Sequence, residues 1–194
     1  MTANVLSVED IANGFTTNPL PPIIGEPTYE SLKVLIKRLY GNVVSVKTPA
    51  GGEGHGHLGM LMDPQLYATI SATPWTTPTD PRISPTFVQG RFYDEPTKEA
   101  IRSDFKERKR LYHNYLNMDT ALKNQITKAI DDVYVDELND PYTGYMQLTA
   151  KDILDWLVQR YGKISAADLQ DNKTRFNEPM DTSQPVSVYF KKDG

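Results

Sequence analysis

The chain has 194 residues, of which 39% are apolar and 24% charged, with a formal net charge of −4 and a pI near 5.4. No apolar run approaches the roughly 20 residues that cross a bilayer. The absence of cysteine excludes disulfides, zinc knuckles and thiol catalysis, and it fits a reducing compartment. The acidic balance disfavours a protein whose main work is to bind phosphates. A mean hydropathy of −0.50 is typical of a globular chain.

Residues 1–27 are predicted to form an N-terminal arm. The segment has no basic region followed by an apolar core, so it does not resemble a secretory signal. Ser7 can cap a short helical turn, because Asp10 follows at the spacing of a capping box. The prolines of residues 18–22 then favour extended backbone. Apolar residues at helical spacing predict the next helix over residues 28–40.

Two short apolar runs, 43–46 and 58–62, flank a glycine-rich segment, and together they predict a β-hairpin. Asp63 and Pro64 have the chemistry of an N-cap and a first helical residue. They predict a short helix whose inward-facing residues would be Leu66, Tyr67 and Ile70. Residues 73–91 carry four prolines and are predicted to form a long loop along the surface.

Two long helices are predicted next, over residues 94–117 and 119–138. The second has the most regular pattern in the chain, with apolar residues spaced at three and four. The second helix is expected to begin at Asp119. The fold class predicted from these patterns is mainly α, with one short β-hairpin.

Residues 147–190 contain three predicted helix starts. Thr149 with Asp152 and Ser165 with Asp168 each place a hydroxyl at an N-cap and a carboxylate three residues on. The first of these helices is expected to pack through Ile153, Leu154, Leu157, Val158 and Tyr161, and to end at Gly162. A third helix is predicted from Ser183. It has only about two turns before residue 194, so we expect the natural chain to continue beyond that point.

His55 and His57, in the glycine-rich segment 51–57, are candidate metal ligands. Two histidines one residue apart can bind one ion, but a zinc site needs further ligands. Only Glu53, Asp63 and His113 could supply them, so the favoured interpretation is a turn with solvated histidines. The same segment lacks the Gly-Lys-Ser/Thr ending of a P-loop and the G-x-G-x-x-G register of a dinucleotide fold. No metal or cofactor site is therefore predicted.

Four cations in the first long helix, Lys106, Arg108, Lys109 and Arg110, are candidates for RNA contact. Cationic side chains with nearby tyrosines can bind RNA through phosphates and stacking. Glu99, Asp104 and Glu107 are interleaved with them, which is ordinary for a solvated helix face with ion pairs one turn apart. Both interpretations stay open, and the second is favoured.

Trp156 lies beside the apolar face of its helix, where a core role is the default and a partner-facing role is the alternative. No nucleophile elbow, H-E-x-x-H motif or recognisable carboxylate pair occurs, so no catalytic residues are predicted. An enzyme that depends on a metal or a nucleotide would have to rely on His55 and His57.

Four stretches, in this order and spacing, resemble the Gag polyprotein of copia-type LTR retrotransposons, particularly the branch found in algae and other protists. They are GGEGHGHLGMLMDPQLYATISATPW (51–75), ALKNQITKAIDDVYVDEL (121–138), PYTGYMQLTAKDILDWLVQRYGKISAADLQDN (141–172) and PMDTSQPVSVYF (179–190). The segment ILDWLVQRYG resembles the helix that closes the N-terminal lobe of Gag-type capsid proteins.

The resemblance implies an arm at 1–27, an N-terminal capsid lobe at 28–162 and the start of a C-terminal lobe at 163–194. It also implies a structural, non-enzymatic, intracellular protein that in its full-length form self-associates into a virus-like particle enclosing RNA. The second lobe often supplies capsid dimer contacts, so for this chain a monomer or a dimer is the alternative. No membrane partner and no cofactor are implied. The candidates for self-association are Trp156, Tyr161, Tyr189 and Phe190. A domesticated Gag that serves as an adaptor or peptide-binding module is the alternative, because domestication keeps the fold.

Overall fold

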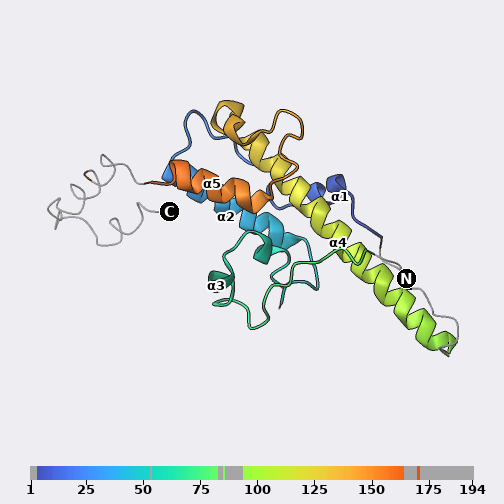
Figure 1. The fold of residues 1–194 in the computed structure, drawn as a ribbon. Coiled ribbons are helices and arrows are strands. Elements are labelled where there is room, and N and C mark those ends of the chain that lie inside the picture. Colours follow the sequence, from blue (N-terminus) through green and yellow to red (C-terminus); the bar gives the residue numbers. More distant parts are fainter. Residues whose placement is uncertain (1–3, 53, 83–84, 86–93, 164–169, 171–194) are drawn as a thin grey trace, which may run out of the picture. The chain divides into compact units, whose positions relative to one another are not determined.

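The computed structural model describes residues 4–52, 54–82, 85, 94–163 and 170. These residues form a mainly helical fold, as predicted, and their only β pairing is an isolated bridge between Asp140 and Gly144 (Figure 1). The chain divides into two units, Met1–Gly162 and Lys163–Gly194, and nearly all described residues belong to the first. The elements are α1 (Val8–Asn13), α2 (Tyr29–Ser45), η1 (Leu58–Met60), α3 (Pro64–Tyr67), α4 (Glu95–Ala129), η2 (Asp132–Tyr134), η3 (Asp136–Leu138) and α5 (Ala150–Tyr161).

The N-terminal segment packs into the first unit instead of standing apart as an arm. The predicted capping box is present, since Ser7 accepts a hydrogen bond from the Asp10 backbone N–H at 3.0 Å. Ile11, Phe15 and Leu20 are all buried in the same core as α2 and α4. These three large apolar side chains lie within ten residues of one another, and removing them from water stabilises the packed position of the segment.

Helix α2 continues to Ser45, so the predicted β-hairpin is wrong. Val43 extends the buried face that Leu39 belongs to, and Val46, the extended residue that follows the helix, is also buried. Burial on that face outweighs the weak strand preference of β-branched residues. The second run, 58–62, is also not a strand, because η1 begins at Leu58 and the run turns into the core.

The glycine-rich segment wraps the C-terminal end of α2. The backbone N–H of His57 donates to the carbonyl of Val43 at 2.9 Å, which satisfies one of the carbonyls that a helix end leaves open. Gly56 has a φ of +53°, and a Cβ there would lie 2.6 Å from the Val43 carbonyl oxygen and 2.8 Å from that of Val46. Only glycine fits this close approach. The segment therefore serves as a C-terminal cap of α2.

The short helix α3 begins as predicted, with Asp63 accepting from the Gln65 backbone N–H at 2.8 Å and Pro64 in the first turn. Its packing differs from the prediction, since only Tyr67 is buried. Leu66 and Ile70 are largely exposed. Trp75, in the proline-rich loop, packs against the core as expected of a loop that follows the surface.

Helix α4 is one element of 35 residues, so the two helices predicted at 94–117 and 119–138 are not separate. Met118 and Asp119, at the expected break, are buried in its middle. The helix ends at Ala129, because Ile130 is extended and the Asp131 carboxylate accepts from the Val133 backbone N–H to start η2. The apolar spacing from residue 130 to 138 therefore belongs to 3₁₀ turns.

A buried amide pair joins the N-terminal segment to α2 and α4. The Asn42 side chain accepts from the Thr17 backbone N–H at 2.7 Å and donates to its carbonyl at 2.8 Å. It also donates to Gln125 Oε1 at 2.9 Å. Gln125 in turn donates to the Thr17 carbonyl at 3.0 Å. Buried amides are stable only when their hydrogen bonds are satisfied, so this pair fixes where the segment crosses the helices.

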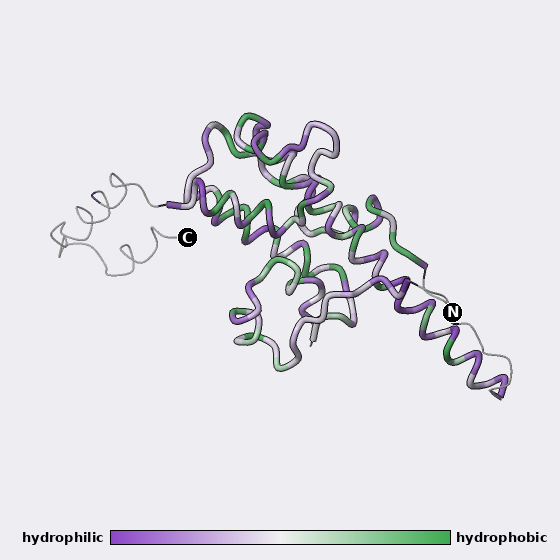
Figure 2. Tube along the Cα trace, viewed as in Figure 1, coloured by the Kyte–Doolittle hydropathy of each residue, from purple (hydrophilic) through white to green (hydrophobic). Residues whose placement is uncertain are grey.

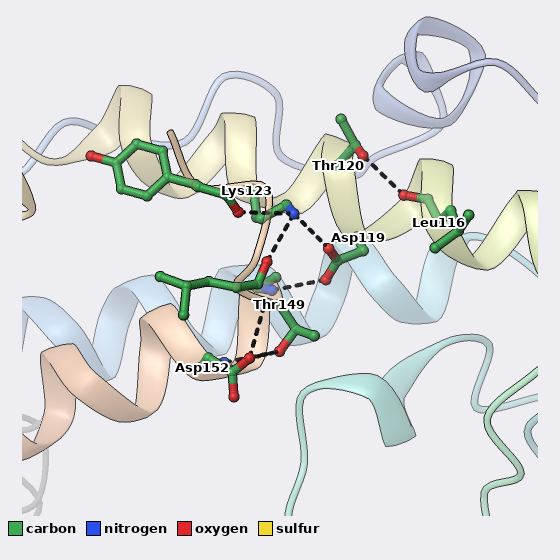
Figure 3. Close-up of polar contacts among 9 residues, drawn as sticks. Leu116, Asp119, Thr120, Lys123, Thr149 and Asp152 are labelled. Atoms are coloured by element: carbon green, nitrogen blue, oxygen red, sulfur yellow. Dashed lines mark hydrogen bonds and ion pairs between the residues drawn. The ribbon is translucent and has the colours of Figure 1, made fainter. Parts of the chain in front are cut away.

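Helix α5 lies along α2 and is held to α4 by the carboxylate of Asp119 (Figures 1 and 3). Asp119 Oδ1 accepts from the Ala150 backbone N–H at 2.8 Å, and Oδ2 lies 3.0 Å from Lys123 Nζ. Lys123 Nζ also donates to the Leu148 carbonyl at 2.8 Å. The predicted box at Thr149 and Asp152 is confirmed beside it. Backbone N–H groups in the first turn of α5 thus find acceptors in Asp119 of α4 and in the neighbouring Thr149.

The first prediction concerns this contact. Replacing Asp119 with Ala removes the acceptor of the Ala150 N–H and the counter-ion of Lys123 in a nearly buried place, where the Asp119 and Lys123 side chains are only 12% and 14% exposed. We expect the free energy of unfolding to fall by about 3 kcal/mol, measured by denaturant titration.

The matched control is Asp104→Ala. It removes an ion pair with the same i, i+4 spacing on the same helix, but both partners are about 60% exposed. Its loss should be below about 0.5 kcal/mol. Equal losses in the two variants would show that the Asp119 contact is no stronger than a surface ion pair.

Candidate functional site

The candidate metal ligands His55 and His57 have different surroundings. His57 is only 2% exposed, its ring lies 5.9 Å from that of Trp75, and its Nδ1 has no hydrogen-bond partner. Burial lowers the pKa of His57 to about 4, so the imidazole is neutral at pH 7. The His55 ring lies 6.1 Å from that of Tyr67. The interpretation of both histidines as solvated is therefore wrong for His57, which is a core residue.

The other ligands considered for a metal do not gather around these histidines. Asp63 caps α3, and His113 lies within α4. Glu53 is outside the described residues. Among the residues that the structure describes, no group of three or more His, Cys, Asp or Glu side chains is arranged to hold a metal ion.

An aromatic cluster lies at the C-terminal end of α5. Trp156 and Tyr161, two of the candidates for self-association, meet edge to face with centroids 5.9 Å apart. Tyr161 makes a similar contact with Tyr134 at 6.0 Å, and its hydroxyl donates to the Tyr134 carbonyl at 3.4 Å. Arg160 stacks over the Trp156 ring at 5.8 Å. The three rings are partly buried against the core, so they connect α5 to η2.

The other two candidates for self-association, Tyr189 and Phe190, lie outside the described residues, as do the helices predicted from Ser165 and Ser183. On α5 itself, Val158 is 42% exposed, although it was expected to pack inward. The buried face of α5 consists of Ala150, Ile153, Leu154 and Leu157.

The four cations proposed for RNA contact lie in the first half of α4, on two different faces. Lys106, Lys109 and Arg110 share one face at three- and four-residue spacing. Arg108 is two residues from Lys106, about 200° round the helix. It pairs with Asp104 at 2.8 Å.

Three of these cations differ in whether a carboxylate pairs with them. Arg110 makes two hydrogen bonds to Glu107, at 2.5 and 2.8 Å, and these raise the pKa of the guanidinium. Within the described part of the chain, Lys106 and Lys109 form no ion pair. Residues 95–110 carry six cations and four carboxylates, a net charge of +2. This is a modest charge for binding a phosphate backbone.

Sequence reasoning missed a surface at the opposite end of α4, over residues 131–146. Its three most exposed apolar side chains are Val133 at 70%, Tyr142 at 94% and Met146 at 79%. The segment also holds five exposed carboxylates, Asp131, Asp132, Asp136, Glu137 and Asp140. The sequence signal was present, because no cation occurs between Lys128 and Lys151. The prediction instead placed residues 131–138 in an amphipathic helix and the residues after them in a connecting loop.

The turn that carries Tyr142 is held by Asp140. One carboxylate oxygen of Asp140 accepts from the backbone N–H groups of Tyr142 and Thr143 at 2.9 and 2.8 Å. These bonds lower the pKa of Asp140, so its charge persists at neutral pH. Glu137 lies 3.6 Å from Arg160, and both are more than half exposed. The segment is thus an ordered loop with a fixed negative charge.

Comparison with protein families, curated proteins and solved structures finds no match to this chain. No helix among the described residues has both the length and the apolar composition needed to cross a membrane.

The second prediction concerns the buried imidazole of His57. Its folded pKa, about 4, lies below the ordinary 6.5, so below pH 6.5 the unfolded state binds a proton that the folded state does not. The free energy of unfolding is therefore not reduced by His57 above pH 6.5, and it falls by up to about 3 kcal/mol as the pH decreases towards 4. Denaturant titrations of wild type and His57→Leu across this range measure the difference.

The decrease in the free energy of unfolding between pH 6.5 and 5 should be smaller in His57→Leu than in wild type. It should be unchanged in His55→Leu, because that variant retains the buried imidazole. Equal pH slopes in wild type and His57→Leu would show that another group governs acid stability in this window.

Proposed function

We propose that this chain is a structural protein that self-associates, and that it is the Gag-type capsid protein of a copia-type LTR retrotransposon. Two kinds of observation support the proposal. The order and spacing of four sequence stretches resemble that family, and the first unit is mainly helical. On this proposal the protein forms an intracellular virus-like particle, encloses RNA and has no enzymatic role.

The observation that carries the proposal is the exposed apolar surface of residues 131–146. Single exposed apolar residues are ordinary, but Val133, Tyr142 and Met146 are 70–94% exposed within fourteen residues of one ordered segment. Contact with another protein surface would remove them from water. In the proposed particle, that contact is made by a neighbouring copy.

RNA has a secondary role in this proposal. The net charge of −4 and the modest charge of residues 95–110 favour enclosure by an assembled shell over tight binding by each copy. Lys106, Arg108, Lys109 and Arg110 stay candidates for RNA contact, and a solvated helix face stays the favoured interpretation. Trp156 and Tyr161 remain predicted contributors to assembly, through the sides of their rings that the core does not cover.

The third prediction tests the proposal. Sedimentation velocity over a concentration series should show self-association of the wild-type chain. Replacing Tyr142 and Met146 with Asp should weaken it at least about tenfold, or ~1.4 kcal/mol, because both side chains leave water on association. The control changes two apolar residues of other helices, Val34→Asp with Leu66→Asp, which are 53% and 52% exposed. It should associate like wild type.

Electron microscopy of the associated protein distinguishes the function classes. Closed particles are the expected result. A monodisperse monomer at every concentration that retains a peptide ligand would contradict the capsid function and favour an adaptor.

A further inference from the structure

The first half of α4 has a different environment from the second half. All eight buried residues of α4 lie between Asn114 and Ala129. From Glu95 to His113, about 28 Å of helix, no residue is buried. This half extends beyond α1, α2 and α5, and it is mainly hydrophilic with apolar positions at intervals (Figures 1 and 2). We call it the basic helix end.

The basic helix end carries an apolar stripe beside a cationic one. Ile101, Phe105 and Tyr112 follow one another at helical spacing and are only half-buried. Lys106 and Lys109 lie on the neighbouring face, are exposed, and form no ion pair within the described part of the chain. An amphipathic helix ordinarily buries its apolar stripe against another surface. This half therefore has the features of a docking helix.

The other end of α4 leads into residues 131–146, which we call the acidic cap. It combines five exposed carboxylates with the exposed Val133, Tyr142 and Met146. One of the carboxylates, Glu137, is paired with Arg160 of α5 at 3.6 Å. The charge is −5 there and +2 over residues 95–110. Both surfaces carry apolar side chains, and their net charges are opposite in sign. They are complementary in charge and similar in apolar content.

The two surfaces cannot meet within one molecule. They lie at opposite ends of an uninterrupted helix of 35 residues, about 52 Å long. The helix is fixed in its second half by the core and by Asp119. Complementary surfaces that are held apart in one copy can still meet between copies.

We infer that the basic helix end of one copy docks on the acidic cap of a second copy, head to tail. This inference rests on the proposed self-association and names the surfaces that make it. Such a contact joins two different patches, and when it repeats head to tail it is heterologous and builds rings or open chains. Burial of Phe105 and Tyr112 against Tyr142 and Met146 would supply the apolar contact, with the charges setting direction.

A second copy explains the basic helix end better than RNA does. Phosphate recognition requires a high local positive charge, whereas Glu107 and Asp104 pair with two of the cations. A phosphate backbone also offers no apolar surface against which the apolar stripe of the same half-helix could be buried. The acidic cap has both the negative charge and the exposed apolar side chains that would complement this half-helix, and every copy of the chain carries one acidic cap.

Charge reversal tests the inference. The helix variant combines Lys106→Glu and Lys109→Glu, and the cap variant combines Asp132→Lys and Asp136→Lys. All four residues are exposed, and no hydrogen bond or ion pair of their side chains within the described chain is lost. Each variant alone should self-associate at least about tenfold more weakly than wild type in sedimentation velocity, since like charges would face each other.

Association should return when both reversals are present, either as an equimolar mixture of the two variants or in one chain with all four changes. In both cases a negative helix end meets a positive cap again. The control, Lys37→Glu with Arg38→Glu on the exposed face of α2, makes the same charge change as the helix variant and should associate like wild type.

Introduced cysteines provide a direct measurement, because the chain has none of its own. A Lys106→Cys chain mixed with an Asp136→Cys chain should give a mixed dimer with a short bismaleimide crosslinker. Lys37→Cys in place of Lys106→Cys should not.

The outcomes separate the inference from the proposed function. Association that survives every reversal, without the mixed crosslink, overturns the inference and leaves self-association in place. A wild-type chain that never associates overturns both. If the helix variant loses binding to a single-stranded oligouridine while self-association is unchanged, the basic helix end is an RNA surface and the inference is wrong.

Discussion

The carboxylate of Asp119 joins the middle of α4 to the first turn of α5, and the arrangement of the first unit depends on that contact. One oxygen satisfies the Ala150 N–H, and the other holds Lys123, which reaches the Leu148 carbonyl (Figure 3). An ion pair with so little exposure to solvent is stable only when its partners are fully satisfied. Here four groups meet at one site, two from α4, one from α5 and one from the residues just before it, so α5 cannot shift without breaking their contacts.

Continuity of α4 follows from the same residue. An aspartate after a helical run can start a new helix, but the Asp119 side chain is used by α5, and Met118 beside it is fully buried. The uninterrupted helix fixes the acidic cap at one end and extends the basic helix end away from the core at the other. Separation of complementary surfaces by a rigid element is a simple way to direct contacts between copies instead of within one.

Prediction from the sequence succeeded where the signal was local. Ser7, Thr149 and Asp63 each cap a helix as expected, because capping depends on residues two or three positions away. It failed at Val43, where strand propensity suggested a β-strand and core burial produced a helix. The acidic cap was missed for a related reason: the apolar spacing of residues 130–138 fits an α-helix, whereas Ile130 leaves the helix and Asp131 starts a new turn.

The mainly helical class, the helix caps, the absence of cysteine chemistry and the charges at residues 95–110 and 131–140 all follow from the sequence without knowledge of the fold. The packing of the folded chain shows which of these residues are buried and which are exposed. Gly56 caps α2 because the end of that helix lies against it, and His57 is neutral because Trp75 and the core exclude water. The distance between the basic helix end and the acidic cap exists only because one helix runs unbroken through the core. Local propensity does not report which residues distant in sequence are buried together, and that burial determines the Gly56 cap, the neutral His57 and the unbroken α4.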